Sequence, residues 1–167
     1  LDVDLTVRQG ERIALRGKNG CGKTTVLKLI YGKEISFTGT LKKASGMKIS
    51  YVSQDTSDLR GDLSEYARRY GIDESLFKTI LRKFGFLRDQ FTKNMENFSG
   101  GQKKKVLIAR SLCEKAHLYI WDEPLNYIDV LSRMQIEELL LEYQPTLLFV
   151  EHDKLFCDKI ATKTVML

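Results

Sequence analysis

Residues 17–24, Gly-Lys-Asn-Gly-Cys-Gly-Lys-Thr, restrict the possible folds of this chain more than any other stretch. They fit the pattern G-x-x-x-x-G-K-[ST], in which a glycine-rich turn between a strand and a helix wraps around phosphate groups. The flanks fit as well, because residues 12–16 predict a short strand and residues 25–30 predict a helix. Glycines let backbone N–H groups turn inward, and the helix presents its N-terminus to the same anion. The stretch therefore predicts a nucleotide-binding site in an α/β domain.

The residue types in this loop suggest which part of a nucleoside triphosphate each would contact. Lys23 is placed to reach the β- and γ-phosphates, and the Thr24 hydroxyl is placed to hold Mg²⁺. The predicted nucleotide-binding residues of the loop are Gly17, Lys18, Asn19, Gly20, Cys21, Gly22, Lys23, Thr24 and Thr25. The alternative, a glycine-rich turn that matches by accident, is disfavoured by the strand and helix on either side.

Length and composition are those of one soluble globular domain. The chain has 167 residues, of which 43% are hydrophobic and 29% charged, so it can form a core of its own. No apolar run approaches the roughly 20 residues that a membrane span requires. Three cysteines without metal-ligand spacing favour reduced thiols in the cytoplasm. The net charge of +5 is compatible with a polyanionic partner. The apolar end and the missing initial Met suggest a piece of a longer protein.

The hydrophobic pattern predicts a parallel α/β core with two additions. Alternating apolar and polar residues predict strands over 1–7, 36–41 and 47–52, with an antiparallel β portion near the N-terminus. Helical spacing predicts an α-helical subdomain over 55–99. The remaining elements are expected as helices over 102–113, 132–143 (with Ser132 as cap) and 154–160, and as strands over 118–121, 146–150 and the last residues. Strands alternating with helices indicate a parallel core, made of residues 1–54 and 100–167.

Polar side chains follow three of the predicted core strands. Asp122 and Glu123 end an apolar strand, and the carboxyl end of a parallel strand opens into the ligand crevice. Asp122 is therefore predicted to hold Mg²⁺ through water, and Glu123 to act as general base. Gln54 and His152 follow the other two strands, where a γ-phosphate or its metal would lie. The alternatives are a strand-ending Asp-Glu-Pro turn and a histidine with a purely structural hydrogen bond.

A second set of N–H donors is expected where Ser99, Gly100, Gly101 and Gln102 begin a helix. One nucleotide would not require two such sets, and the alternative is an N-cap with flexible glycines. The three lysines that follow, 103–105, spread over more than half of the helix circumference. They are predicted to form a solvated face, with contact to RNA as the lesser alternative.

Taken in this order, the motifs resemble the nucleotide-binding domain of ATP-binding cassette (ABC) proteins over nearly the whole chain. The matching segments are Walker A at 17–24, the Q-loop at Gln54, the signature at 99–102, Walker B ending at Asp122, and then Glu123 and His152. The resemblance implies a P-loop NTPase (RecA-like) fold with ATP and Mg²⁺ as ligands. It implies that Gln54 contacts Mg²⁺ and the attacking water, that Glu123 is the catalytic base, and that His152 contacts the γ-phosphate. Phe98 replaces the usual leucine before the signature.

The same resemblance implies a partner, because two such domains pair head to tail in this family. The signature of one domain then closes over the ATP that lies on the Walker A of the other. The partner cassette belongs either to the same protein or to a second copy. Since each site needs two cassettes, and the adenine-stacking aromatic upstream of Walker A is missing, we expect the isolated chain to bind MgATP weakly and to hydrolyse it slowly.

Residues 123–129, Glu-Pro-Leu-Asn-Tyr-Ile-Asp, resemble the E-P-x-N-x-x-D segment of the ABC-F group. ABC-F proteins are soluble, carry two cassettes and act on the ribosome, and several confer antibiotic resistance. Residues 51–54, 102–105 and 121–126 are most similar to the resistance type and to its second cassette. The resemblance thus implies a cytoplasmic ATPase that acts on the ribosome and its RNA. The alternatives are the motor domain of an ABC membrane transporter and a nucleotide-dependent switch without useful turnover, for which Glu123 would be superfluous.

Overall fold

The computed structural model describes residues 1–167, and a parallel sheet of five strands lies at its centre. The strands are β1 (Arg12–Arg16), β2 (Ile49–Val52), β3 (Leu118–Asp122), β4 (Leu147–Val150) and β5 (Lys163–Met166), in the spatial order β2-β3-β4-β1-β5. Every neighbouring pair is parallel. β1 is an interior strand of the sheet, because Ala14 lies opposite Phe149 of β4 on one side and Thr164 of β5 on the other.

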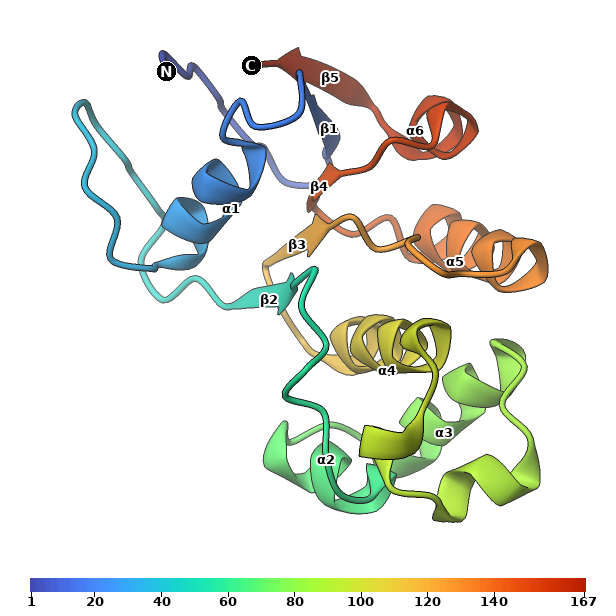
Figure 1. The fold of residues 1–167 in the computed structure, drawn as a ribbon. Helices are drawn as coiled ribbons and strands as arrows, with labels where there is room; N and C mark the ends of the chain where they lie inside the picture. The colour runs from blue at the N-terminus through green and yellow to red at the C-terminus, as the bar shows by residue number, and fades with distance from the viewer.

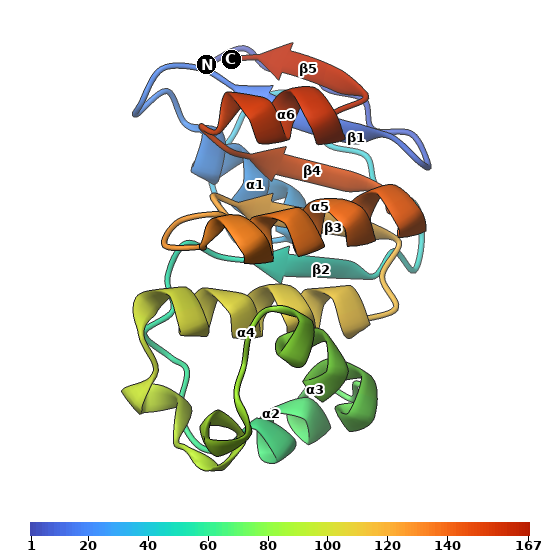
Figure 2. The same ribbon diagram turned by 90° about the vertical axis from the view of Figure 1, so that its right-hand side faces the viewer.

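Helices cover both faces of the sheet, as parallel strands require. One face carries α1 (Lys23–Tyr31), and the other carries α5 (Val130–Tyr143) and α6 (Lys154–Ile160) (Figure 1). The helix α4 (Gly100–Cys113) lies along the β2 edge, parallel to α5 in the view of Figure 2. Beyond α4 are α2 (Leu63–Arg69), α3 (Glu74–Lys83) and the short 3₁₀ helices η1 (Arg88–Thr92) and η2 (Met95–Asn97).

The core has two parts because successive side chains of a strand point to opposite faces. Ile13 and Leu15 of β1 join a cluster of seven buried residues that includes Leu27 of α1. Ala14, between them, joins a cluster of 26 buried residues under the helices of the other face. The larger cluster continues into α2 and α3, where Phe77 is fully buried. This continuity fixes the helical segment against the sheet core.

Most predicted elements are confirmed in type and place. The predicted strand 12–16 and helix 154–160 have the observed bounds, and the helices expected from 102 and 132 begin two residues earlier. The predicted cap of α5, Ser132, is wrong. The N-cap residue is Asp129, whose carboxylate accepts from the Ser132 N–H at 3.0 Å. None of the helices is long and apolar enough to cross a lipid bilayer.

The two strands predicted near the N-terminus are wrong, and with them the antiparallel portion. Residues 1–8 and 34–46 contain no strand, and no backbone–backbone hydrogen bond joins residues 1–7 or 34–43 to another part of the chain. Of the apolar residues that alternate over 1–7, Leu5 and Val7 are half-buried against the smaller core cluster, whereas Leu1 and Val3 are exposed. No neighbouring strand supplies a hydrogen-bonded ladder, so the period of two does not correspond to a strand.

The predicted solvated face at 103–105 is also wrong. Lys104 is 2% exposed, and its ammonium donates to the carbonyl oxygens of Ser53 (3.0 Å) and Gln54 (3.4 Å). Lys105 forms an ion pair with Asp129 at 2.7 Å. The charge run in the sequence conceals the inward direction of Lys104, because α4 lies between the sheet core and the helical segment and is buried on more than one side.

Candidate functional site

The loop between β1 and α1 has the geometry expected of a phosphate cradle. Gly22 lies at the N-cap of α1 with φ +100°, a left-handed conformation that glycine adopts without steric cost. Lys23, the first residue of α1, is 7% exposed. Its ammonium donates to the carbonyl oxygens of Gly17 and Lys18, both at 2.9 Å. The loop thus bends around its own lysine, and the first turn of α1 faces the same space.

Three oxygen-bearing side chains meet beside this loop, from three elements. The Gln54 amide nitrogen donates to Thr24 Oγ1 at 3.2 Å and to Asp122 Oδ1 at 2.9 Å. Asp122 is fully buried at the end of β3, and its second oxygen, Oδ2, has no hydrogen-bond partner. A buried carboxylate oxygen without a partner is costly unless a cation is bound there. Hydroxyl, amide and carboxylate oxygens are the ligands that Mg²⁺ takes. Thr24 and Asp122 offer such oxygens here, and Gln54, whose amide nitrogen faces the site, would offer its oxygen after rotation of the amide, so these residues fit that ion.

Glu123 is held in an unusual backbone conformation next to this cluster. Its φ of +49° is in the left-handed region, which costs a residue with a Cβ about 1 kcal/mol or more. The Glu123 N–H donates to the Val150 carbonyl at 2.8 Å, and this bond ties the turn to β4. The Glu123 carboxylate accepts from Asn126 Nδ2 at 3.0 Å and lies 3.0 Å from His152 Nε2. Asn126 contacts Oε2 and His152 contacts Oε1, so each oxygen of the carboxylate has one side-chain partner.

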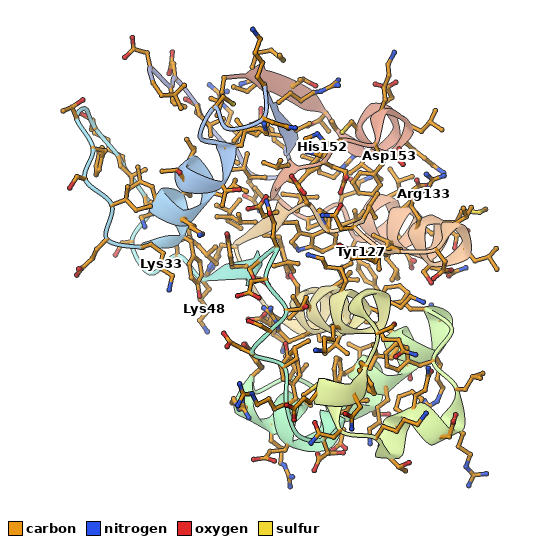
Figure 3. The ribbon with its side chains drawn as sticks, in the orientation of Figure 1. Lys33, Lys48, Tyr127, Arg133, His152 and Asp153 are labelled. Carbon is orange, nitrogen blue, oxygen red and sulfur yellow. The ribbon has the colours of Figure 1, made fainter.

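The structure brings most of the predicted site residues to one cavity of about 500 Å³. The lining comes from the phosphate loop and from the carboxyl ends of β2, β3 and β4. It consists of Asn19, Gly20, Gly22, Lys23, Thr24, Thr25, Gln54, Glu123, Val150 and His152. Gly17, Lys18 and Cys21 shape the loop behind Lys23. Figure 3 shows His152 near the start of α6, beside the ion pair that Asp153 forms with Arg133 at 2.8 Å.

Ser99 to Gln102 are not in the lining of this cavity, and half of their donors are used within the chain. Ser99 Oγ accepts from the Gln102 N–H at 3.1 Å, and Gln102 Oε1 accepts from the Ser99 N–H at 2.9 Å, which makes a capping box. Gly101 must be glycine for a local reason, because a Cβ there would lie 2.5 Å from the Tyr127 carbonyl oxygen. The N–H groups of Gly100 and Gly101 remain as the donors of this helix start.

Three residues that support the site were not predicted from the sequence. Lys104 lies under the Q-loop, where burial lowers its pKa and the field of Asp122 and Glu123 acts against that shift. Asn126 orients Glu123, and only its three-residue spacing from Glu123 indicates this. Glu151 is 7% exposed and accepts from the N–H groups of Leu125 and His152, which fixes the turns after β3 and β4. Burial raises the pKa of Glu151. The only indication of this role in the sequence is that Glu151 directly precedes His152.

A glycine-rich loop after an interior strand of a parallel sheet, with a candidate cation site and an oriented carboxylate beside it, defines a P-loop nucleotide-binding domain. A sequence model of the family described as "ABC transporter" matches residues 1–126. The chain therefore belongs to the ABC family of ATPases.

The curated relatives agree with this assignment. The chain is 35% identical over 170 residues to "Putative ATP-binding protein YdiF" of Bacillus subtilis, a match that covers 99% of the chain and 26% of that protein. It is 31% identical over 172 residues to "Ribosome protection protein VmlR" of the same organism, covering 99% of the chain and 31% of that protein. The chain thus spans about a quarter to a third of these relatives. The predicted resemblance to the ABC-F group is confirmed, because the relatives are of that type.

Solved structures confirm the predicted P-loop fold. The chain is 26% identical to "Structure of ATP binding subunit of ABC transporter", with a TM-score of 0.82 over 99% of this chain and 78% of the other. It is 28% identical to the chain in a complex of archaeal ribosomal stalk protein aP1 with the archaeal ribosome recycling factor aABCE1. That match has a TM-score of 0.78 and covers 96% of this chain and 32% of the other.

Proposed function

We propose that the chain binds MgATP on residues 17–25 and hydrolyses it as one cassette of a head-to-tail pair. The pair belongs to a cytoplasmic ABC-F translation factor of the antibiotic-resistance type, which acts on the ribosome. The partner cassette lies in the same protein or in a second copy. Two relatives support the biological role by their descriptions, since one is a ribosome protection protein and the other a ribosome recycling factor.

One observation carries the nucleotide proposal. A single cavity of about 500 Å³ joins the phosphate loop to Gln54, Glu123 and His152 at the carboxyl ends of three strands, next to the unpartnered oxygen of Asp122. A phosphate cradle, a cation site and a general base are the parts that phosphoryl transfer to water requires, and here they converge. In a protein that only binds nucleotide, the strained and doubly oriented carboxylate of Glu123 would have no task.

The side chains have distinct roles in the proposed reaction. Lys23 and the N–H groups of the loop hold the phosphates, while Thr24, Gln54 and Asp122 hold Mg²⁺, which neutralises charge on the phosphate oxygens when bound. Glu123 takes a proton from the attacking water, and His152 fixes the direction of that carboxylate and contacts the γ-phosphate. The signature N–H groups of the partner cassette close the site from outside. Loss of the γ-phosphate removes the charge that holds the two cassettes together.

The proposal is tested with Glu123→Gln in the natural protein that carries this chain. The variant keeps the size and the hydrogen bonds of the side chain but cannot accept a proton. We expect phosphate release to fall by about 10²-fold or more, with ATP binding retained. The matched control is Glu142→Gln, an exposed carboxylate of α5. Unchanged phosphate release in Glu123→Gln would refute the role as base.

The same variant separates the ribosomal role from its main rival. With ATP bound and hydrolysis blocked, a translation factor remains on its target, so we expect Glu123→Gln to sediment with ribosomes in an ATP-dependent manner. The motor domain of a transporter would be recovered with membranes instead. Recovery in the membrane fraction alone would overturn the ABC-F role and leave the ATPase assignment intact.

A further inference from the structure

Lys104 is a buried cation in a place where packing alone would favour an apolar residue. Its neighbours on α4, Val106 and Ile108, are fully buried, and Lys104 itself is 2% exposed. Burying an ammonium ion is expensive unless it is paired or fully hydrogen-bonded. No carboxylate lies within 4.0 Å of its nitrogen, so the two carbonyl oxygens of the Q-loop are its only hydrogen-bond acceptors. Such a contact requires an explanation beyond packing.

Both carbonyls that Lys104 binds belong to one turn, and that turn has little other support. From Ser53 to Asp58 the main chain makes a single backbone–backbone hydrogen bond, in which Thr56 O accepts from Leu59 N at 3.2 Å. Two short side-chain bonds hold the middle of the segment, from Ser53 Oγ to Asp55 O and from Ser57 N to Asp55 Oδ1. The ammonium of Lys104 is thus what fixes the first two carbonyls of the turn to a helix.

Gln54 is the residue of this turn whose side chain reaches the proposed magnesium site. Its amide reaches Thr24 on α1 and Asp122 on β3, at 3.2 and 2.9 Å, across the place where Mg²⁺ fits. Gln54 is exposed, so packing does not hold it in this position. The direction of its backbone therefore decides where its amide lies, and Lys104 holds that backbone.

We propose that Lys104 is a positioning residue: by binding the Ser53 and Gln54 carbonyls it aims the Gln54 amide at the magnesium site and ties the Q-loop to the start of α4. The inference rests on the proposed function and deepens it. Lys104 lies two residues after Gln102, on the same helix as the signature donors.

The test uses Lys104→Met, which keeps the length of the side chain and removes its charge and donors. The dissociation constant of a fluorescent ATP analogue is measured in Mg²⁺ and in EDTA. The ratio, which is the value in EDTA divided by the value in Mg²⁺, reports how much the metal strengthens binding. Loss of a residue that supports a metal ligand lowers metal affinity by roughly 10- to 100-fold. We expect Lys104→Met to reduce the ratio about tenfold, with little change of affinity in EDTA. Lys103→Met, one position away, is the matched control and should leave the ratio unchanged.

A double-mutant cycle distinguishes positioning from a general loss of structure. If Lys104 acts through Gln54, then Lys104→Met reduces the ratio in the wild-type background and has no further effect in Gln54→Ala. In the absence of nucleotide and metal, hydrogen exchange should become faster at the amides of residues 53–57 in Lys104→Met, and stay the same in α6. This second readout does not depend on activity.

The outcomes separate the inference from the function on which it rests. If the wild-type chain binds the analogue no better in Mg²⁺ than in EDTA, the proposed metal site fails. If the wild type depends on Mg²⁺ and Lys104→Met has an unchanged ratio, or adds its full effect to Gln54→Ala, the inference about Lys104 is refuted. Should Lys104→Met not fold, Lys104→Gln is measured in the same way, and an unchanged ratio there is likewise decisive against the inference.

Discussion

The ammonium of Lys23 illustrates how a single side chain is prepared for an anion. Two carbonyl oxygens of its own loop, from Gly17 and Lys18, hold the nitrogen at 2.9 Å each. An ammonium group has three donors, and the third is directed at Cys21 Sγ at 3.8 Å, a weak acceptor that a phosphate oxygen would replace. Because Lys23 is 7% exposed, the attraction that it exerts on an anion is screened less than that of a surface lysine.

Replacing this residue gives the first prediction. Lys23→Ala removes the cation from the cradle and should abolish detectable binding of the nucleotide, measured by titration with a fluorescent ATP analogue. The matched control is Lys28→Ala, which removes an exposed lysine from the same helix and should bind like the wild type. If binding in Lys23→Ala were undiminished, the nucleotide would have to lie elsewhere on the molecule.

Candidate site residues could be predicted where a sequence motif specifies them. They could not be predicted where their role depends on the direction in which a helical side chain points. The loop residues, Asp122, Glu123 and His152 were singled out because each stands in a turn or at a strand end, positions that spacing along the chain reveals. Lys104 was not found, because three consecutive lysines give no sign of which one points inward. That direction depends on the helical segment packing against α4 from the other side. It is a property of tertiary structure alone.

At the scale of elements, the start of α5 is joined to the signature helix by one carboxylate. Asp129 caps α5 by accepting from the N–H and the hydroxyl of Ser132 at 3.0 and 2.8 Å, and it pairs with Lys105 of α4 at 2.7 Å. Partial burial by itself would raise the pKa of Asp129. The bonds from Lys105 and Ser132 outweigh that effect and hold the pKa well below its ordinary value.

This linkage predicts a pH dependence of stability. Asp129→Asn keeps a good capping side chain but loses the charge, so the free energy of unfolding at pH 7 should fall by about 0.2–1 kcal/mol, the range for exposed ion pairs. Since the folded pKa lies below the unfolded value of about 3.9, the contribution is complete above that pH and is lost as the pH falls toward the folded pKa. Urea unfolding should therefore show a smaller difference between the two proteins at pH 3 than at pH 7.

The control for this prediction is Asp158→Asn, an exposed carboxylate on α6 without an ion pair. It should change stability little at either pH. A difference for Asp129→Asn that stayed constant between pH 7 and pH 3 would contradict the assigned ion pair.

Element types were predictable where one face or both faces of a segment are buried, as for residues 118–122 and 147–150. The failure at 1–7 and 36–41 has a physical reason, since a strand exists only with a neighbour to bond to and the alternation of side chains does not supply one. The start of α5 was missed for a similar reason. Both Asp129 and Ser132 are good capping residues, and the backbone of Asp129, with ψ 159°, decides between them.

At the scale of the whole molecule, the cavity and the signature donors do not meet within one chain. If the site is completed by a second cassette, as we propose, the rate of hydrolysis should depend on the encounter of two cassettes. We expect the isolated chain to release phosphate slowly, at a rate per molecule that rises with protein concentration. A fast rate per molecule that is independent of concentration would contradict the shared site. The measurement is steady-state phosphate release over a concentration series, with Glu123→Gln as the blank.

The position of β1 has a consequence for the newly made chain. The strand that leads into the phosphate loop is bonded on one side to residues 147–149 and on the other to residues 163–166. While residues 25–146 are being synthesised, the Walker A segment therefore has neither flanking strand to pair with. Strands that are far apart in the sequence pair slowly during folding. On the proposed function, we therefore expect the loop to bind ATP stably only after residues 147–166 have been made.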